Sequence, residues 1–152
     1  MRYLILSLLF LTACQFHPLY SQQTIEGICV TDIPENSGFL LQQKLEQHFP
    51  NKTDCSYRLV VNSPTFSLSD QSVSDKDFIT MQKVQAKTSY KLLNSNNNVL
   101  LSDAVAVNGS SAVVSSPYST VVSVEKTQMN LIPILADQIS LHISAFLDRT
   151  QP

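Results

Sequence analysis

The sequence predicts an α+β fold, a β-α-β-β-β-α sandwich in which a roughly four-stranded, mostly antiparallel sheet has two helices packed on one face. Apolar residues recur every three or four positions in two segments, which indicates two amphipathic helices. Apolar and polar residues alternate through a long segment between them, which is typical of half-exposed strands. The length of 152 residues suits one domain with one core.

The first half of the chain supplies two strands and one helix. Residues 24–31 (TIEGICVT) read as a first strand, which Pro34 ends. Residues 37–49 read as a helix with Leu41, Leu45 and Phe49 on its apolar side and with Ser37 as its N-cap. Residues 57–68 (YRLVVNSPTFSL) read as one second strand, in which Pro64 indicates an edge or a bulge.

The second half supplies a long hairpin and a long helix. Residues 78–93 alternate, with Val84, Ala86 and Tyr90 on one face, and a polar turn at 94–98 leads back into a strand at 99–107. Ser116 and Pro117 are typical of a helix start. The apolar stripe that follows runs to Phe146, and Pro133 within it should kink the helix or divide it in two.

The first 13 residues read as an export signal. Residues 3–11 are almost entirely apolar and follow Arg2, and they make up about half of the roughly 20 residues that a membrane-spanning helix needs. The stretch Leu11-Thr12-Ala13-Cys14 resembles the lipobox of bacterial lipoproteins. That resemblance implies cleavage before Cys14, acylation of Cys14, and a mature domain over residues 14–152; an ordinary secretory signal is the alternative.

The resemblance also implies a location. Three acyl chains would anchor the protein stably, whereas a single chain binds membranes only reversibly. Gln15, rather than Asp, follows the cysteine, and the sorting rule of enteric bacteria then implies a protein anchored in the outer membrane and facing the periplasm.

The two other cysteines, Cys29 and Cys55, leave two alternatives open. An oxidising periplasm permits a disulfide between them. If parallel strands surround them, Cys29 lies about 13 Å along its strand while Cys55 precedes the next strand, and this offset favours two buried thiols.

Residues of the mature chain resemble LptE, the lipopolysaccharide-assembly lipoprotein, in its alphaproteobacterial form. Phe16-His17-Pro18-Leu19-Tyr20 matches a stretch that follows the lipid-bearing cysteine in that family, although Gln15 replaces the usual Gly. Weaker similarity extends over 89–92, 116–122 and 135–139. The resemblance implies a partner of the outer-membrane barrel LptD that helps the barrel to assemble and binds lipopolysaccharide without catalysing a reaction.

A row of lysines is the candidate ligand site. Lys83, Lys87 and Lys91 share one face of the predicted strand at spacings of roughly 13 Å, and Lys76 precedes them. They could contact phosphates or acidic sugars of lipopolysaccharide. The alternative is that they only keep an exposed face soluble and discourage pairing at a sheet edge.

Enzyme, metal and nucleic-acid functions find little support in the sequence. His17, His48 and His142 are scattered, without Cys or acidic residues at ligand spacing, so we expect no metal and no cofactor. Asp75 and Asp77 read as a solvated turn, and no nucleophile or phosphate-loop motif is present. The formal net charge of −2 argues against a nucleic-acid partner.

Two other readings remain open. One is an auxiliary lipoprotein of an ABC-type lipid-trafficking system, whose members also follow a lipobox with a small α+β domain. The other is a membrane-tethered periplasmic hydrolase, for which the sequence offers no recognisable catalytic site.

Overall fold

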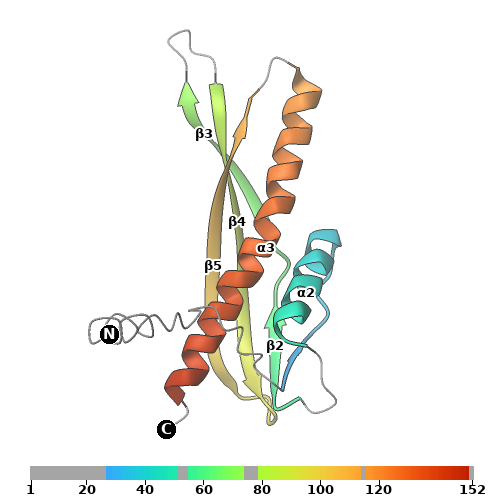
Figure 1. Ribbon diagram of the computed structural model, residues 1–152, viewed down its shortest axis with the longest axis vertical. Coiled ribbons are helices and arrows are strands. Elements are labelled where there is room, and N and C mark those ends of the chain that lie inside the picture. Colours follow the sequence, from blue (N-terminus) through green and yellow to red (C-terminus); the bar gives the residue numbers. More distant parts are fainter. Residues whose placement is uncertain (1–26, 51–54, 74–78, 114–115, 151–152) are drawn as a thin grey trace, which may run out of the picture.

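The structure is a computed structural model that describes residues 27–50, 55–73, 79–113 and 116–150. Over these residues the chain is an α+β protein with one mostly antiparallel sheet and two helices, as the sequence predicts (Figure 1). In chain order the elements are β1 (Ile28–Val30), α2 (Asn36–His48), β2 (Tyr57–Val61), β3 (Thr65–Val73), β4 (Ile79–Asn94), β5 (Val99–Ala112) and α3 (Pro117–Thr150).

β4 is the central strand of the sheet. It pairs along most of its length with β5, and on its other side with β2 at one end and β3 at the other, all antiparallel. β1 extends the sheet beyond β2 as the one parallel pair in the described residues. The edges of the sheet are therefore β1, β3 and β5, and β4 has no free edge over its paired residues.

The prediction of a single second strand over residues 57–68 is wrong. It consists of β2 and β3, which follow each other along the same side of β4 and make the sheet five-stranded rather than four-stranded. The break falls at Asn62, Ser63 and Pro64, where Pro64 has no backbone N–H to donate to a ladder. The Ser63 hydroxyl donates instead to the Pro34 carbonyl at 2.8 Å.

The predicted hairpin is confirmed and is longer than expected. β5 continues to Ala112, five residues beyond the predicted end. In the turn, Asn97 adopts a left-handed conformation with φ of 60°, which Asn tolerates better than most residues. The Asn94 side chain accepts hydrogen bonds from the backbone N–H groups of Asn96 and Asn98 at 3.0 and 2.9 Å, and these bonds fix the turn.

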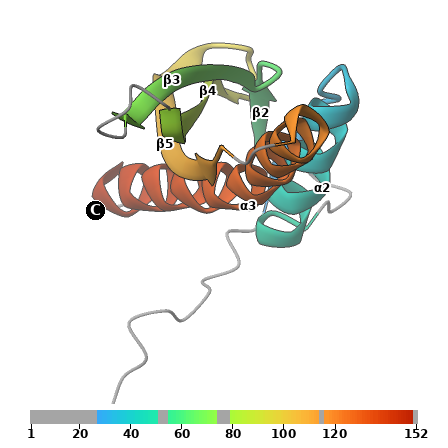
Figure 2. The same cartoon turned by 90° about the horizontal axis from the view of Figure 1, so that it is seen from above.

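The two helices differ from the prediction at single residues. α2 begins at Asn36, and Glu35 rather than Ser37 occupies the N-cap position without a side-chain capping bond. α3 begins at Pro117 as predicted. Of the two outcomes predicted at Pro133, the helix shows the kink and not the division. It continues on both sides of this residue, and its two parts run in different directions (Figures 1 and 2).

The core lies between the helices and one face of the curved sheet, which we call the inner face (Figure 2). The side chains that alternate inward from the central strands meet the apolar stripes of both helices, as predicted. Members of this core include Leu59, Val84, Ala86, Leu92, Leu41, Leu45, Leu135, Ile139 and Ile143.

α3 is also long and apolar enough to cross a membrane, and it is the one such helix in the described residues. Leu135, Ile139 and Ile143 of this helix are fully buried against the rest of the domain. Packing against the domain buries 39% of the apolar membrane-length window and accounts for that part of its apolar character.

Candidate functional site

The predicted lysine row lies on the outer face of the sheet, the face turned away from α3. Strand alternation places Val84, Ala86 and Tyr90 in the core, so Lys83, Lys87 and Lys91 point the other way. Lys87 and Lys91 are exposed and Lys83 is half-buried. The structure therefore brings the three described lysines together along β4, as the sequence predicted.

The neighbours of each lysine in the sheet are uncharged. Lys83 is paired with Ser69 and Ser110, Lys87 with Thr65 and Ala106, and Lys91 with Val60 and Ser102. Within the part of the chain that the structure describes, none of these lysines forms an ion pair. Since Lys87 and Lys91 are exposed, their ammonium groups are accessible to an external anion.

The acidic residues of the strands lie on the opposite, inner face. Asp70 is paired with Gln82, and its carboxylate accepts a hydrogen bond from the Gln82 side-chain amide at 3.4 Å. Asp103 is paired with the buried Tyr90. No acidic side chain therefore shares the outer face among the described strand residues, although the chain as a whole is mildly acidic.

Arg58 adds a fourth cation that the sequence analysis missed. It is paired with Leu93, two positions beyond Lys91, on the outer face of β2. Its guanidinium donates to the Asn97 side chain at 3.1 Å, which holds it against the hairpin turn. Because Arg58 alternates with the inward-facing Tyr57 and Leu59, the sequence could indicate that Arg58 points outward. It could not indicate that β2 pairs with β4 and so places Arg58 near the lysines.

The position of β4 excludes one of the roles predicted for the lysines, which is to discourage pairing at a sheet edge. They do not guard a sheet edge, because β4 is paired on both sides along the row. A role in keeping the exposed face soluble is still compatible with their placement. An anion-binding role is compatible too, and it is favoured because no acidic side chain lies on this face among the described strand residues.

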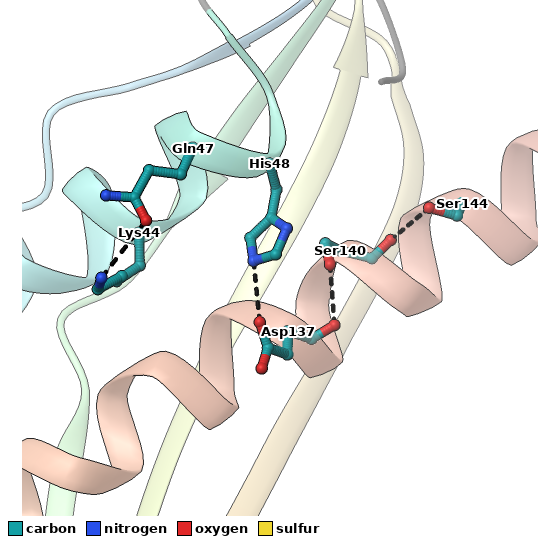
Figure 3. A network of polar contacts seen from close by, with 6 residues as sticks. All are labelled: Lys44, Gln47, His48, Asp137, Ser140 and Ser144. Atoms are coloured by element: carbon teal, nitrogen blue, oxygen red, sulfur yellow. Dashed lines mark hydrogen bonds and ion pairs between the residues drawn. The ribbon is translucent and has the colours of Figure 1, made fainter. Parts of the chain in front are cut away.

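Two histidines, which the sequence placed apart from acidic residues, contact aspartates in the fold. His48 Nε2 lies 2.9 Å from Asp137 Oδ1 and joins α2 to α3 (Figure 3). His142 Nδ1 lies 3.1 Å from the Tyr90 hydroxyl and 3.5 Å from Asp103 Oδ2, and so joins α3 to the sheet. The described residues contain no group of three or more His, Cys, Asp and Glu that could hold a metal ion.

Among the described residues, Tyr90 is the titratable group with a clear pKa shift. Burial, and secondarily the negative charge of Asp103, raises its pKa to about 12. Both causes disfavour the phenolate, since burial removes solvation and a nearby like charge repels it. The Tyr90 hydroxyl therefore stays protonated at neutral pH.

The preference for two separate thiols is wrong, because Cys29 and Cys55 form a disulfide with their Cα atoms 5.5 Å apart. β1 begins at Ile28, opposite Tyr57, so Cys29 is only the second residue of its strand. Cys55 precedes β2, so its position does not follow the regular rise of a strand. It can therefore lie beside β1. The disulfide closes a loop that contains all of α2.

Several predicted residues lie outside the described part of the chain. These are the signal segment 1–13, Cys14, His17, Asp75, Lys76 and Asp77.

Solved structures of bacterial lipoproteins share this fold. Rare lipoprotein B from Shewanella oneidensis is 8% identical, with a TM-score of 0.66 over 84% of this chain and 98% of its own. A minor lipoprotein from Acinetobacter baumannii is 17% identical, with a TM-score of 0.58 over 78% of this chain and 93% of its own. Lipoprotein B from Nitrosomonas europaea is 16% identical, with a TM-score of 0.57 over 80% and 86%.

Comparison at the level of sequence adds no relative, since no family model and no curated protein matches this chain. The similarity therefore concerns the fold: over most of its length, this chain has an architecture that is found in bacterial lipoproteins.

Proposed function

We propose that this protein is an LptE-like lipoprotein of the bacterial outer membrane. It is anchored through acyl chains on Cys14 and faces the periplasm. It partners an LptD-like barrel in the assembly and transport of lipopolysaccharide, which it binds without catalysis.

One coincidence supports this proposal more than any other observation. A lipobox-like stretch that ends at Cys14 precedes a domain whose fold occurs in bacterial lipoproteins. The first observation comes from the sequence and the second from the fold. The similarity of residues 16–20 to LptE sequences narrows the proposal from a lipoprotein to that family.

The disulfide supports the proposed compartment. Disulfides persist in the oxidising periplasm and are rare in the cytosol of most bacteria. The bridge between Cys29 and Cys55 therefore agrees with an exported protein.

Lipid attachment is tested by replacing Cys14. In cells supplied with radiolabelled palmitate, we expect label on the wild-type protein and none on Cys14→Ser, which should also leave the membrane fraction. Ser119→Ala is the control, because it changes an exposed position of α3 that carries neither the lipid nor the disulfide. Equal labelling of wild type and Cys14→Ser would contradict the anchor.

Co-purification in mild detergent tests the partner. We expect an outer-membrane barrel to be recovered with the tagged full-length protein. Recovery of an inner-membrane transporter in its place would contradict the proposal and favour the ABC-type lipid-trafficking alternative.

A further inference from the structure

We propose that the outer face of the sheet binds the phosphate-bearing sugar region of lipopolysaccharide, and not its acyl chains. This inference rests on the proposed function and names the surface and the part of the ligand that are involved. We call this surface the cationic face and define it by Arg58, Lys83, Lys87 and Lys91.

The charge of the cationic face is the first argument. Its four cations are spread over about 30 Å of strand. Leu93, the partner of Arg58, lies ten positions after Lys83, and a strand rises about 3.3 Å per residue. The described strands place no acid on this side, because Asp70 and Asp103 both lie on the inner face. An extended ligand with several anionic groups matches this surface better than a ligand with one.

The uncharged side chains of the same surface are the second argument. Apart from Lys87, the outer positions of β3, β4 and β5 between Lys83 and Lys91 carry only hydroxyl, amide and methyl groups. Thr65, Ser67, Gln85 and Asn108 are examples. Hydroxyl and amide groups can donate to and accept from sugar hydroxyls. The larger apolar side chains of this face, Met81, Leu93 and Val99, lie beyond the two ends of the lysine row, and the smaller Val60 lies beside Lys91.

The third argument is that the described strand residues place no aromatic side chain on this face. Proteins that bind single-stranded nucleic acid combine a basic track with aromatic residues on which the bases stack. The described strands turn Tyr57, Phe66 and Tyr90 towards the core. The cationic face thus offers ion pairs and hydrogen bonds without stacking, which favours a phosphorylated sugar over a nucleic acid.

The test measures binding of the full-length mature protein to three probes. These are purified lipopolysaccharide, its deacylated oligosaccharide with the phosphates retained, and the same oligosaccharide after phosphatase treatment. We expect the first two to bind and the third to bind at least tenfold more weakly. Binding should also weaken as salt is raised, because exposed charges are screened.

Lys83→Gln/Lys87→Gln/Lys91→Gln should bind the phosphorylated oligosaccharide about tenfold more weakly or worse, since each exposed ion pair contributes modestly and three are lost. Lys44→Gln/Lys126→Gln/Arg149→Gln is the matched control, because it removes three positive charges from the helices. We expect the control to change affinity by less than about twofold, as these charges lie away from the cationic face.

Folding of both variants is checked by circular dichroism and by their urea midpoints. If the triple variant unfolds, the single variant Lys87→Gln and the salt dependence of the wild type provide the same test. Equal affinities of the triple variant and its control would overturn the inference.

Three further outcomes would also overturn it. Binding of lipopolysaccharide without binding of the deacylated oligosaccharide would indicate recognition of acyl chains. Equal, lysine-dependent binding to phosphatidylglycerol vesicles would indicate a general membrane-charge surface. Tighter binding to a single-stranded oligonucleotide would indicate a nucleic-acid site.

Barrel co-purification with the triple lysine variant separates this inference from the proposed function. We expect the barrel to be recovered with this variant. If the wild type recovers the barrel but does not bind the sugar, the cationic face alone is rejected, whereas failure of the wild type to recover a barrel rejects the proposed function. Loss of the barrel from the triple variant only would overturn the inference, because the lysines would then contact the barrel.

Discussion

Removing the disulfide should cost this protein a large part of its stability. Cys29 and Cys55 are separated by 26 residues. In the chain-entropy model, closing a loop of this length stabilises the folded state by about 3.5 kcal/mol, because the bridge restricts the unfolded chain. Domains typically have a free energy of unfolding of about 5–15 kcal/mol. For a domain of this size the loss corresponds to about 10–15 °C in Tm.

Urea unfolding of wild type and of Cys29→Ser/Cys55→Ser measures this difference. We expect a lower midpoint and a larger dependence on urea for the variant, because its unfolded chain exposes more surface. A reducing agent should bring the wild type to the stability of the variant and should leave the variant unchanged. A difference below about 1 kcal/mol would refute the loop-closure argument, and a wild type insensitive to reductant would refute the bridge itself.

Three further predictions concern the core. Tyr90 has a pKa raised to about 12, so the wild type should lose up to about 2.7 kcal/mol of stability between about pH 9 and 13, because over this range the unfolded state releases the proton before the folded state does; Tyr90→Phe should lack this loss in pH-dependent urea titrations. Ile139→Ala, at a fully buried position, should lower the free energy of unfolding by about 2–5 kcal/mol, and an effect below 1 kcal/mol would contradict the packing described. Gly38→Ala should destabilise despite the higher helix propensity of alanine, because the new Cβ would lie 2.7 Å from the Ile33 Cγ2 atom; a higher Tm would contradict this.

The hairpin and the helices were predictable because their signals are local. Alternation in β4 separates Val84 and Ala86 from Lys83 and Lys87 without reference to any other strand. The apolar stripe of α3 likewise identifies its buried side from the sequence. The helix nevertheless continues through Pro133, since packing along both of its parts outweighs the bond that proline cannot make.

The division of 57–68 into β2 and β3 was less predictable. Pro64 signalled an irregularity, but a bulge and a complete break have the same local sequence signature. The break depends on β4 being long enough to pair with two strands in succession, at Tyr90–Asn94 and at Ile79–Lys87. The length of a partner strand is not encoded in the segment that it pairs with.

The sequence by itself determined the α+β class, the two amphipathic helices, the face of β4 that carries the lysines, and the lipobox-like stretch at Cys14. Only the tertiary structure decided that Cys29 and Cys55 are joined, that β4 is central, and that Arg58 joins the lysine row while Asp70 and Asp103 face away from it. The reason is physical: periodicity fixes which way a side chain points from its own strand, whereas its neighbours depend on strand order and register, which long-range pairing sets.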